Sequence, residues 1–384
     1  MYYCIHKNCM KPFLKIIGIA IGIKILYFVF AVSISSYVIN LGLSYNSSSY
    51  VTTVKSNDSY WYEMISNNGY RKITDKKDIG YHKGTIYKQS EWAFFPMYPL
   101  IIRGTNILFN SDFNKSGIFW SVIFSLLSFI GFYIWMNKSE NALYCTLIFM
   151  CFPFHYYFSM LYTEALFFGC MIFSFIAIRQ KKLWLLSILL IPLTLLRPNG
   201  IALILPLYLY FLEQEKVFEG YKLRIKRIDK KILLKSIAFL TAPIVFVLYG
   251  LYQQQMTGEF FAFIIAQSGW YKNSAFPLFS LFNSGDFTTQ FFSIYTLLFF
   301  MIGIISWKRL PLSINILIWL MLLLPMCAGS MISMPRFISI LFPFSIIIGT
   351  WIYKMKWKYL FIAILFAFQL ATYYFWLIGN SMGY

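Results

Sequence analysis

The sequence predicts an all-α membrane protein that crosses the bilayer many times, and three observations lead to this fold class. Of the 384 residues, 59% are hydrophobic and only 12% are charged, which is more apolar surface than a soluble chain of this length could bury. The apolar residues come in runs of helical length and not in short alternating strands, which excludes an outer-membrane barrel. The basic residues gather mainly in the connections on one side of those runs, as expected for a polytopic protein.

A membrane-spanning helix needs about 20 apolar residues. The first run has no small-residue cleavage site and is too long for a signal peptide, so we expect it to be retained as an anchor. Together the apolar runs predict about eleven spans. They cover residues 13–38, 117–136, 142–160, 164–179, 183–196, 199–212, 232–252, 289–306, 311–328, 336–353 and 359–378.

A further apolar stretch, residues 93–109, is interrupted by Pro96 and Pro99. We expect it to form an interfacial or re-entrant pair of helices packed against protein. The chain would then be a single transmembrane domain over residues 1–384, with an outer loop and interfacial segment at 42–110 within it.

The net charge of +19 predicts how the chain is oriented. With the N-terminus inside, the cytoplasmic side collects 20 of the 33 basic residues against five acids, and the outer side holds 12 against nine. The positive-inside rule therefore predicts a cytoplasmic N-terminus and an outer C-terminus. Contact with anionic membrane lipids accounts for the basic balance, so no nucleic-acid partner is expected. The six cysteines show no paired spacing in polar loops and predict neither a disulfide framework nor a zinc site.

In this topology every unusual polar cluster falls on the outer face. Polar groups at a membrane boundary usually face a bundle interior or a cavity, so their gathering on one side indicates one site that is open to the outside. The clusters are SNDSYWYEMISNNGY at 56–70, EWAFFPMYP at 91–99, YTE at 162–164, RPNG at 197–200, GEFFAFIIAQSGW at 258–270 and SMPRF at 333–337.

The residue types in these clusters suit transfer from a lipid-linked phosphate donor. Asp58 and Glu164 could supply a general base or ligands for a cation. Arg197 and Arg336 could hold a phosphate through charge-assisted hydrogen bonds. Further residues could line the site or stack on a sugar ring. They are Glu91, Trp61, Trp92, Phe95, Asn199, Gln267 and Trp270.

Six of these residues also have a structural interpretation. Asp58 could cap a helix, because SND before an amphipathic stretch is an N-terminal signal. Glu164 could favour a helix N-terminus through the helix dipole. Arg197 and Arg336 could anchor helix ends at lipid headgroups, and Gln267 and Trp270 could pack a loop.

The motifs DSYWYEMISNNGY, EWAFFPMYP, YTEALF, RPNG, AQSGW and PRF, in this order, resemble the PIG-V family. These are the second mannosyltransferases of GPI-anchor synthesis and their prokaryotic relatives, which belong to the GT-C glycosyltransferases. The resemblance covers most of the chain and implies a polyprenyl-phosphate sugar donor used on the non-cytoplasmic side. It also implies that Asp58 is the catalytic acid residue of the first outer loop. The chain departs from the family at Asn57, where Trp is usual, and at Trp61, where a polar residue or His is common.

The resulting hypothesis is a mannosyltransferase-like enzyme of the plasma membrane with an inverting, single-displacement reaction. Asp58 would act as the base, and the turn at Gly69 and Tyr70 would fix the end of the helix that presents it. A lipid-linked or envelope glycan would be the acceptor. The resemblance implies no resident cofactor and leaves a divalent metal open. Two other interpretations remain: a transporter or flippase of lipid-linked sugars, and a structural subunit of a cell-envelope complex.

Overall fold

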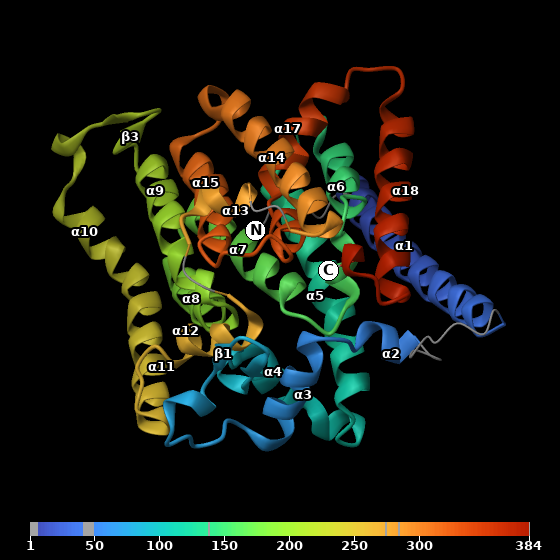
Figure 1. The fold of residues 1–384 in the computed structure, drawn as a ribbon. Coiled ribbons are helices and arrows are strands. Elements are labelled where there is room, and N and C mark those ends of the chain that lie inside the picture. Colours follow the sequence, from blue (N-terminus) through green and yellow to red (C-terminus); the bar gives the residue numbers. More distant parts are fainter. Residues whose placement is uncertain (1–6, 41–49, 137–138, 273–274, 283–284, 384) are drawn as a thin grey trace. The chain divides into compact units, whose positions relative to one another are not determined.

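A computed structural model describes residues 7–40, 50–136, 139–272, 275–282 and 285–383 (Figure 1). The described chain is mainly helical, with two short antiparallel hairpins. The α-helices are α1 (Lys7–Asn40), α2 (Tyr50–Val54), α3 (Asp58–Asn68), α4 (Met97–Thr105), α5 (Phe113–Trp135), α6 (Ala142–Met150), α7 (Glu164–Arg179), α8 (Leu183–Leu196), α9 (Ile204–Gln214), α10 (Lys230–Ser236), α11 (Thr241–Thr257), α12 (Ala262–Ala266), α13 (Pro277–Leu281), α14 (Phe287–Ser306), α15 (Leu312–Met326), α16 (Met334–Ser339), α17 (Phe342–Ile352) and α18 (Lys358–Leu377). The strands are β1 (Tyr81–Lys83), β2 (Ile86–Lys88), β3 (Phe218–Glu219) and β4 (Lys222–Leu223). The start of the expected outer loop 42–110, residues 42–49, lies outside the described residues.

Five helical segments in the described chain are long and apolar enough to cross a membrane. They are Lys11–Ile34, Phe113–Trp135, Lys230–Thr257, Phe287–Arg309 and Lys358–Leu377. Less than half of the most apolar window is buried in each segment, from 22% in the first and third to 44% in the second. Water would penalise such surfaces and lipid would not, so these helices indicate a membrane-embedded protein. The count of eleven spans stays a prediction.

Prolines divide two of the expected spans into shorter helices. The span expected at 142–160 begins as α6, which ends at Met150 ahead of Pro153, and a 3₁₀ turn, η4 (His155–Ser159), follows. The span expected at 336–353 is divided between α16 and α17, with Pro343 in the first turn of α17. Proline lacks a backbone N–H, so it is tolerated at a helix start but interrupts a helix interior.

The chain folds as two compact units, and each is described here by itself. The first unit comprises residues 1–56, 117–172 and 339–384, and the second comprises residues 57–116 and 173–338. Of the residues predicted to form the site, Glu164 belongs to the first unit and all the others belong to the second. A single catalytic domain over the whole chain stays a prediction.

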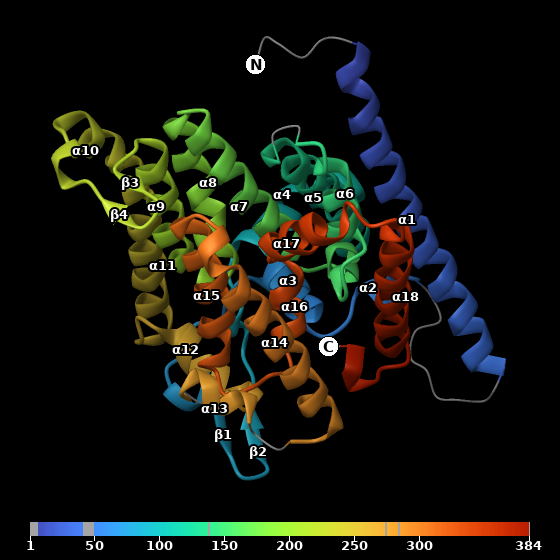
Figure 2. The ribbon, with the colours of Figure 1, turned by 90° about the horizontal axis from the view of Figure 1, so that it is seen from above.

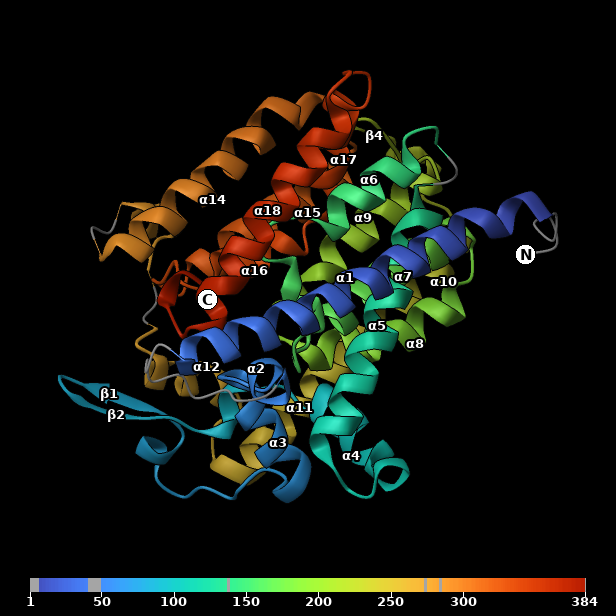
Figure 3. The same cartoon turned by 90° about the vertical axis from the view of Figure 1, so that its right-hand side faces the viewer.

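In the first unit, α1 and α18 pack along each other (Figure 2, Figure 3). Because α6 ends at Met150, backbone carbonyls near the break accept no hydrogen bond within that helix. A side chain of α18 donates hydrogen bonds to two of these carbonyls. Gln369 is fully buried, and its Nε2 donates to the carbonyls of Met150 and Phe152 at 3.2 and 2.6 Å. A buried carbonyl without a donor is costly, so this distant glutamine stabilises the interruption that Pro153 causes.

The second unit is built on helix pairs, α8 with α11 and α9 with α15 (Figure 1). Glu213 at the end of α9 joins one pair by capping α15, because its carboxylate accepts from the Ser313 amide and hydroxyl at 2.9 and 2.6 Å. The connection after α8 is equally tight. A Cβ on Gly200 would lie 2.0 Å from the Leu193 carbonyl oxygen, so only glycine fits this turn.

The long loop of the second unit carries the β1–β2 hairpin, which Figure 2 shows beyond α13. Its strands pair Tyr81 with Lys88 and Lys83 with Ile86. Two glycines let backbones touch here: a Cβ on Gly80 would lie 2.6 Å from the Cα of Ala266, and one on Gly269 would lie 2.4 Å from the Lys88 carbonyl oxygen. The hairpin is thereby fixed against the segment that carries the AQSGW motif.

Candidate functional site

Asp58 is the first residue of α3, and its carboxylate faces Arg336. Arg336 Nη1 donates to Asp58 Oδ2 at 2.6 Å, and the two side chains are 26% and 15% exposed, with Asp58 the more exposed. The N-cap position of α3 is occupied by Asn57, which has a φ of 51° and makes no side-chain capping bond. Asp58 therefore does not act as the N-cap of α3. A pair made across 278 residues of sequence, partly shielded from water, brings two of the predicted site residues together.

Lys272 adds a second cation to this pair, and the sequence analysis did not identify it. It follows AQSGW by two positions and is partly buried. Burial lowers the pKa of Lys272, the negative charge of Asp58 raises it, and the positive charges of Arg336 and Arg197 lower it further. Lys272 is therefore within electrostatic reach of Asp58, Arg336 and Arg197. With all four ionised, they carry one negative and three positive charges.

Arg197 ends α8 in an extended conformation and is only 6% exposed. Its guanidinium carbon lies 5.6 Å from the centre of the Phe337 ring, an interaction typical of arginine with an aromatic face. Phe337 directly follows Arg336, so the RPNG and PRF motifs meet here. Asn199 is 5% exposed, and its Nδ2 lies 3.5 Å from Met321 Sδ.

The turn after α3 fixes the helix that presents Asp58, as predicted. Gly69 ends the helix at a φ of 74°, and its amide donates to the Ile65 carbonyl at 2.8 Å. The Tyr70 hydroxyl then donates to the Phe94 carbonyl at 2.6 Å. The DSYWYEMISNNGY and EWAFFPMYP motifs are thus tied to each other at the far end of α3.

Glu91 forms an ion pair with Arg71 and is completely buried. Its carboxylate accepts from the Arg71 amide at 3.0 Å and from Nε and Nη2 at 2.7 Å each. Burial raises the pKa of Glu91, but the hydrogen bonds from Arg71 outweigh this effect and hold it below its ordinary value. Both carboxylate oxygens of Glu91 accept hydrogen bonds from Arg71, so this ion pair stabilises the fold of the loop.

Three aromatic side chains from three motifs pack together beside α3. Trp61 stacks on Phe94 with ring centres 5.7 Å apart and planes 13° apart. Trp270 meets both rings edge-on, at 5.5 Å from Trp61 and 5.4 Å from Phe94. Trp61 and Trp270 are partly exposed. They offer ring surface within three residues of Asp58 and two residues of Lys272.

The remaining predicted aromatics are packed into the core. Trp92 is fully buried, stacks on Tyr70 at 4.6 Å and donates from Nε1 to the Arg71 carbonyl at 3.2 Å. Phe95 is 1% exposed and packs against Tyr249 and Phe263. Gln267 Nε2 lies 3.5 Å from the Ala93 carbonyl oxygen. These contacts are those of packing residues.

Glu164 is the first residue of α7 and is completely buried in the first unit. A carboxylate in the first turn is favoured by the helix dipole, which agrees with its structural interpretation. In the described part of the chain, no three His, Cys, Asp or Glu side chains come together as a potential metal site. Cys145, Cys151 and Cys170 are buried in the described chain.

Comparison with known proteins gives no family for this chain. No protein-family model matches the sequence, and no curated protein matches it. The similarity of the motifs to the PIG-V family therefore stays a prediction.

Proposed function

We propose that the chain is an integral-membrane glycosyltransferase of the GT-C type. It would transfer a sugar, mannose or a related hexose, from a polyprenyl-phosphate donor to a lipid-linked or envelope glycan acceptor. The observation that carries the proposal is the Asp58–Arg336 pair with Lys272 and Arg197 around it. One carboxylate among three cations supplies a base and leaves positive charge for a phosphate.

The reaction follows from these roles. Asp58 accepts the proton of the acceptor hydroxyl while the hydroxyl oxygen forms a bond to the anomeric carbon. The bond between that carbon and the phosphate oxygen breaks, and polyprenyl phosphate leaves with the electron pair. Arg336 holds Oδ2 of Asp58, so we assign the proton to Oδ1. Attack opposite to the leaving group inverts the anomeric centre, and Lys272, Arg336 and Arg197 stabilise the charge on the phosphate.

The membrane setting supports a lipid-linked donor. Five segments of the described chain are long and apolar enough to span a bilayer. The apolar interior of a bilayer also dissolves the polyprenyl chain of such a donor. In the proposed topology the N-terminus is cytoplasmic, about eleven helices cross the plasma membrane, and the site opens on the outer face. The Trp61, Phe94 and Trp270 cluster provides a face for the sugar ring.

The test is turnover by purified protein in nanodiscs. Polyprenyl-phosphate mannose and polyprenyl-phosphate glucose, each radiolabelled, would be supplied with an extract of native lipids and glycans. We expect transfer or slow hydrolysis with one donor, at least 100-fold reduced in Asp58→Asn. Glu63→Gln, on the same helix, is the matched control and should keep its activity. Equal turnover by wild type and Asp58→Asn would remove Asp58 from the mechanism.

The transporter interpretation makes a different prediction for the same protein in sealed liposomes. A flippase would move the lipid-linked sugar between leaflets without breaking its phosphate bond. Donor that reaches the opposite leaflet intact, with no released polyprenyl phosphate, would therefore contradict the transferase and support transport.

A further inference from the structure

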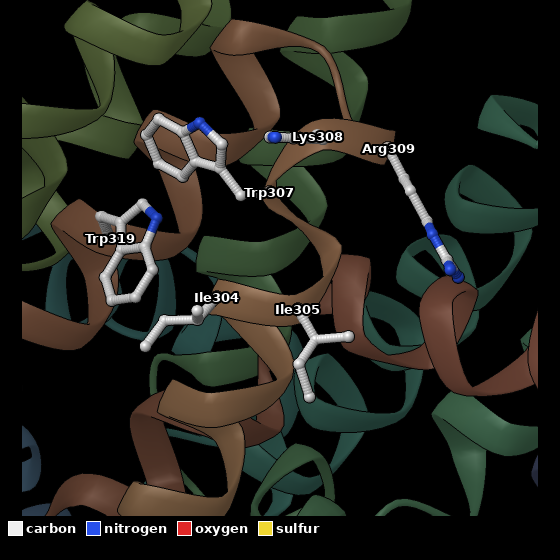
Figure 4. Close-up of a pocket in the computed structure, with 6 residues that line it drawn as sticks. All are labelled: Ile304, Ile305, Trp307, Lys308, Arg309 and Trp319. Carbon is white, nitrogen blue, oxygen red and sulfur yellow. The ribbon is translucent and has the colours of Figure 1, made fainter.

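We infer that a cavity at the end of α14 binds an anionic phospholipid. The cavity has a volume of about 520 Å³ and is lined by Ile304, Ile305, Trp307, Lys308, Arg309 and Trp319 (Figure 4). Its size falls in the usual range for ligand sites of about 300–1,000 Å³. It belongs to the second unit and is independent of the Asp58–Arg336 cluster and of the function proposed for it.

The indole wall of this cavity is held in place before any ligand binds. Trp307 stacks on Tyr221 with ring centres 6.0 Å apart and lies 6.2 Å from the Trp319 ring. Its carbonyl accepts from the Tyr221 hydroxyl and from Asn315 Nδ2, each at 2.8 Å. Phe300 supports Trp319 edge-on at 4.7 Å. A fixed wall needs little reorganisation on binding, which favours affinity.

The two cations of the cavity have no acidic partner within the part of the chain that the structure describes. Lys308 and Arg309 are exposed on the 3₁₀ turn η9 (Trp307–Arg309). The acids of the neighbouring 213–229 segment are engaged elsewhere. Glu213 binds Ser313, Glu215 binds Lys235, Glu219 binds Arg224 and Arg227, and Asp229 binds the Ile232 amide. The anion that Lys308 and Arg309 attract must therefore come from outside this segment.

The order of residues along α14 matches a phospholipid. The helix is part of a membrane-length segment, and its basic residues lie at the end, where lipid headgroups are found. Ile304 and Ile305 precede them in the last turn of α14 and expose 50% and 58% of their surface. Figure 4 shows Ile304 and Ile305 below Lys308, with Arg309 to the right and the two indole rings to the left. A lipid phosphate would bind Lys308 and Arg309, and an acyl chain would lie along Ile304 and Ile305.

Native mass spectrometry of the delipidated full chain tests this site. The protein in detergent is titrated with diacyl phosphatidylglycerol or with diacyl phosphatidylcholine of the same chain length. We expect wild type to bind the anionic lipid more tightly. The double variant Lys308→Gln with Arg309→Gln should lose roughly 30-fold in affinity for it, at about fivefold per basic residue. The variant Lys354→Gln with Lys356→Gln removes two exposed basic residues elsewhere and should bind as wild type does.

Three results would overturn the inference. Equal affinity of wild type for the two lipids would show that the site does not distinguish an anionic from a zwitterionic headgroup. This comparison needs no variant. An equal loss in both double variants would show general attraction by net charge. Competition by soluble glycerophosphoglycerol at the same concentration as the lipid would show that the apolar wall contributes nothing.

Discussion

Replacing Arg71 with methionine should loosen the long loop around Glu91. The change keeps the backbone bond to Glu91 but removes the two side-chain bonds of 2.7 Å. Breaking a fully buried ion pair costs about 3–5 kcal/mol. The Arg71 side chain is 65% exposed and so screened by water, which reduces our estimate to about 2 kcal/mol. That energy corresponds to roughly 30-fold more frequent opening of the loop.

Hydrogen exchange in nanodiscs measures this opening. Amides of the loop, such as that of Ile73, which bonds to the Met256 carbonyl at 2.8 Å, should exchange roughly 30-fold faster in Arg71→Met. Lys72→Met, at the exposed next position, is the control and should leave exchange unchanged. The pKa of Glu91 is lowered in the folded state, so the pair stabilises the loop above the ordinary pKa of 4.5 and this stability is lost as pH falls through the folded pKa. Unchanged exchange in Arg71→Met, or the same increase in Lys72→Met, would show that the Glu91–Arg71 ion pair does not stabilise the loop.

Three further changes test other parts of the account. Lys272→Gln should raise the KM for the donor about 10- to 100-fold with a smaller effect on kcat, whereas Lys272→Arg should restore binding; a wild-type KM in Lys272→Gln would exclude it from the phosphate site. Gly200→Ala places a Cβ against the Leu193 carbonyl and should cost about 1–3 kcal/mol in thermal unfolding, while Gly22→Ala, where nothing lies within 4 Å, should be neutral or stabilising. Gln369→Leu removes the side-chain donor that binds the Met150 and Phe152 carbonyls near the break after α6 and should cost about 1–3 kcal/mol; a melting curve like that of wild type would contradict its role.

Hydropathy predicted the long apolar helices closely because their stability depends on local composition. The spans expected at 289–306 and 359–378 correspond to α14 and α18 within two residues at each end. The helix expected at 142–160 is interrupted after Met150, although the proline that breaks it is visible in the sequence. The partner that stabilises the break could not be predicted from the local sequence, because Gln369 lies more than 200 residues from Met150.

The candidate site shows the same division. Asp58 and Arg336 were identified from their residue types and motifs, but their direct pairing depends on tertiary structure. Lys272 was missed because a single lysine among 33 basic residues carries no local signal, and only its electrostatic coupling to Asp58 marks it. Glu91 was predicted to line the site, and its ion pair with Arg71 was not foreseen because no spacing rule predicts that partner.

The most direct test of the central claim is a cryo-electron microscopy structure of Asp58→Asn with a bound polyprenyl-phosphate sugar. The substitution removes the base and keeps the shape of the side chain, so donor and acceptor should not react. The account predicts the donor phosphate within hydrogen-bonding distance of Arg336 and Lys272, with the anomeric carbon facing residue 58. A donor phosphate bound at another part of the chain, with Arg336 and Lys272 away from it, would contradict the account.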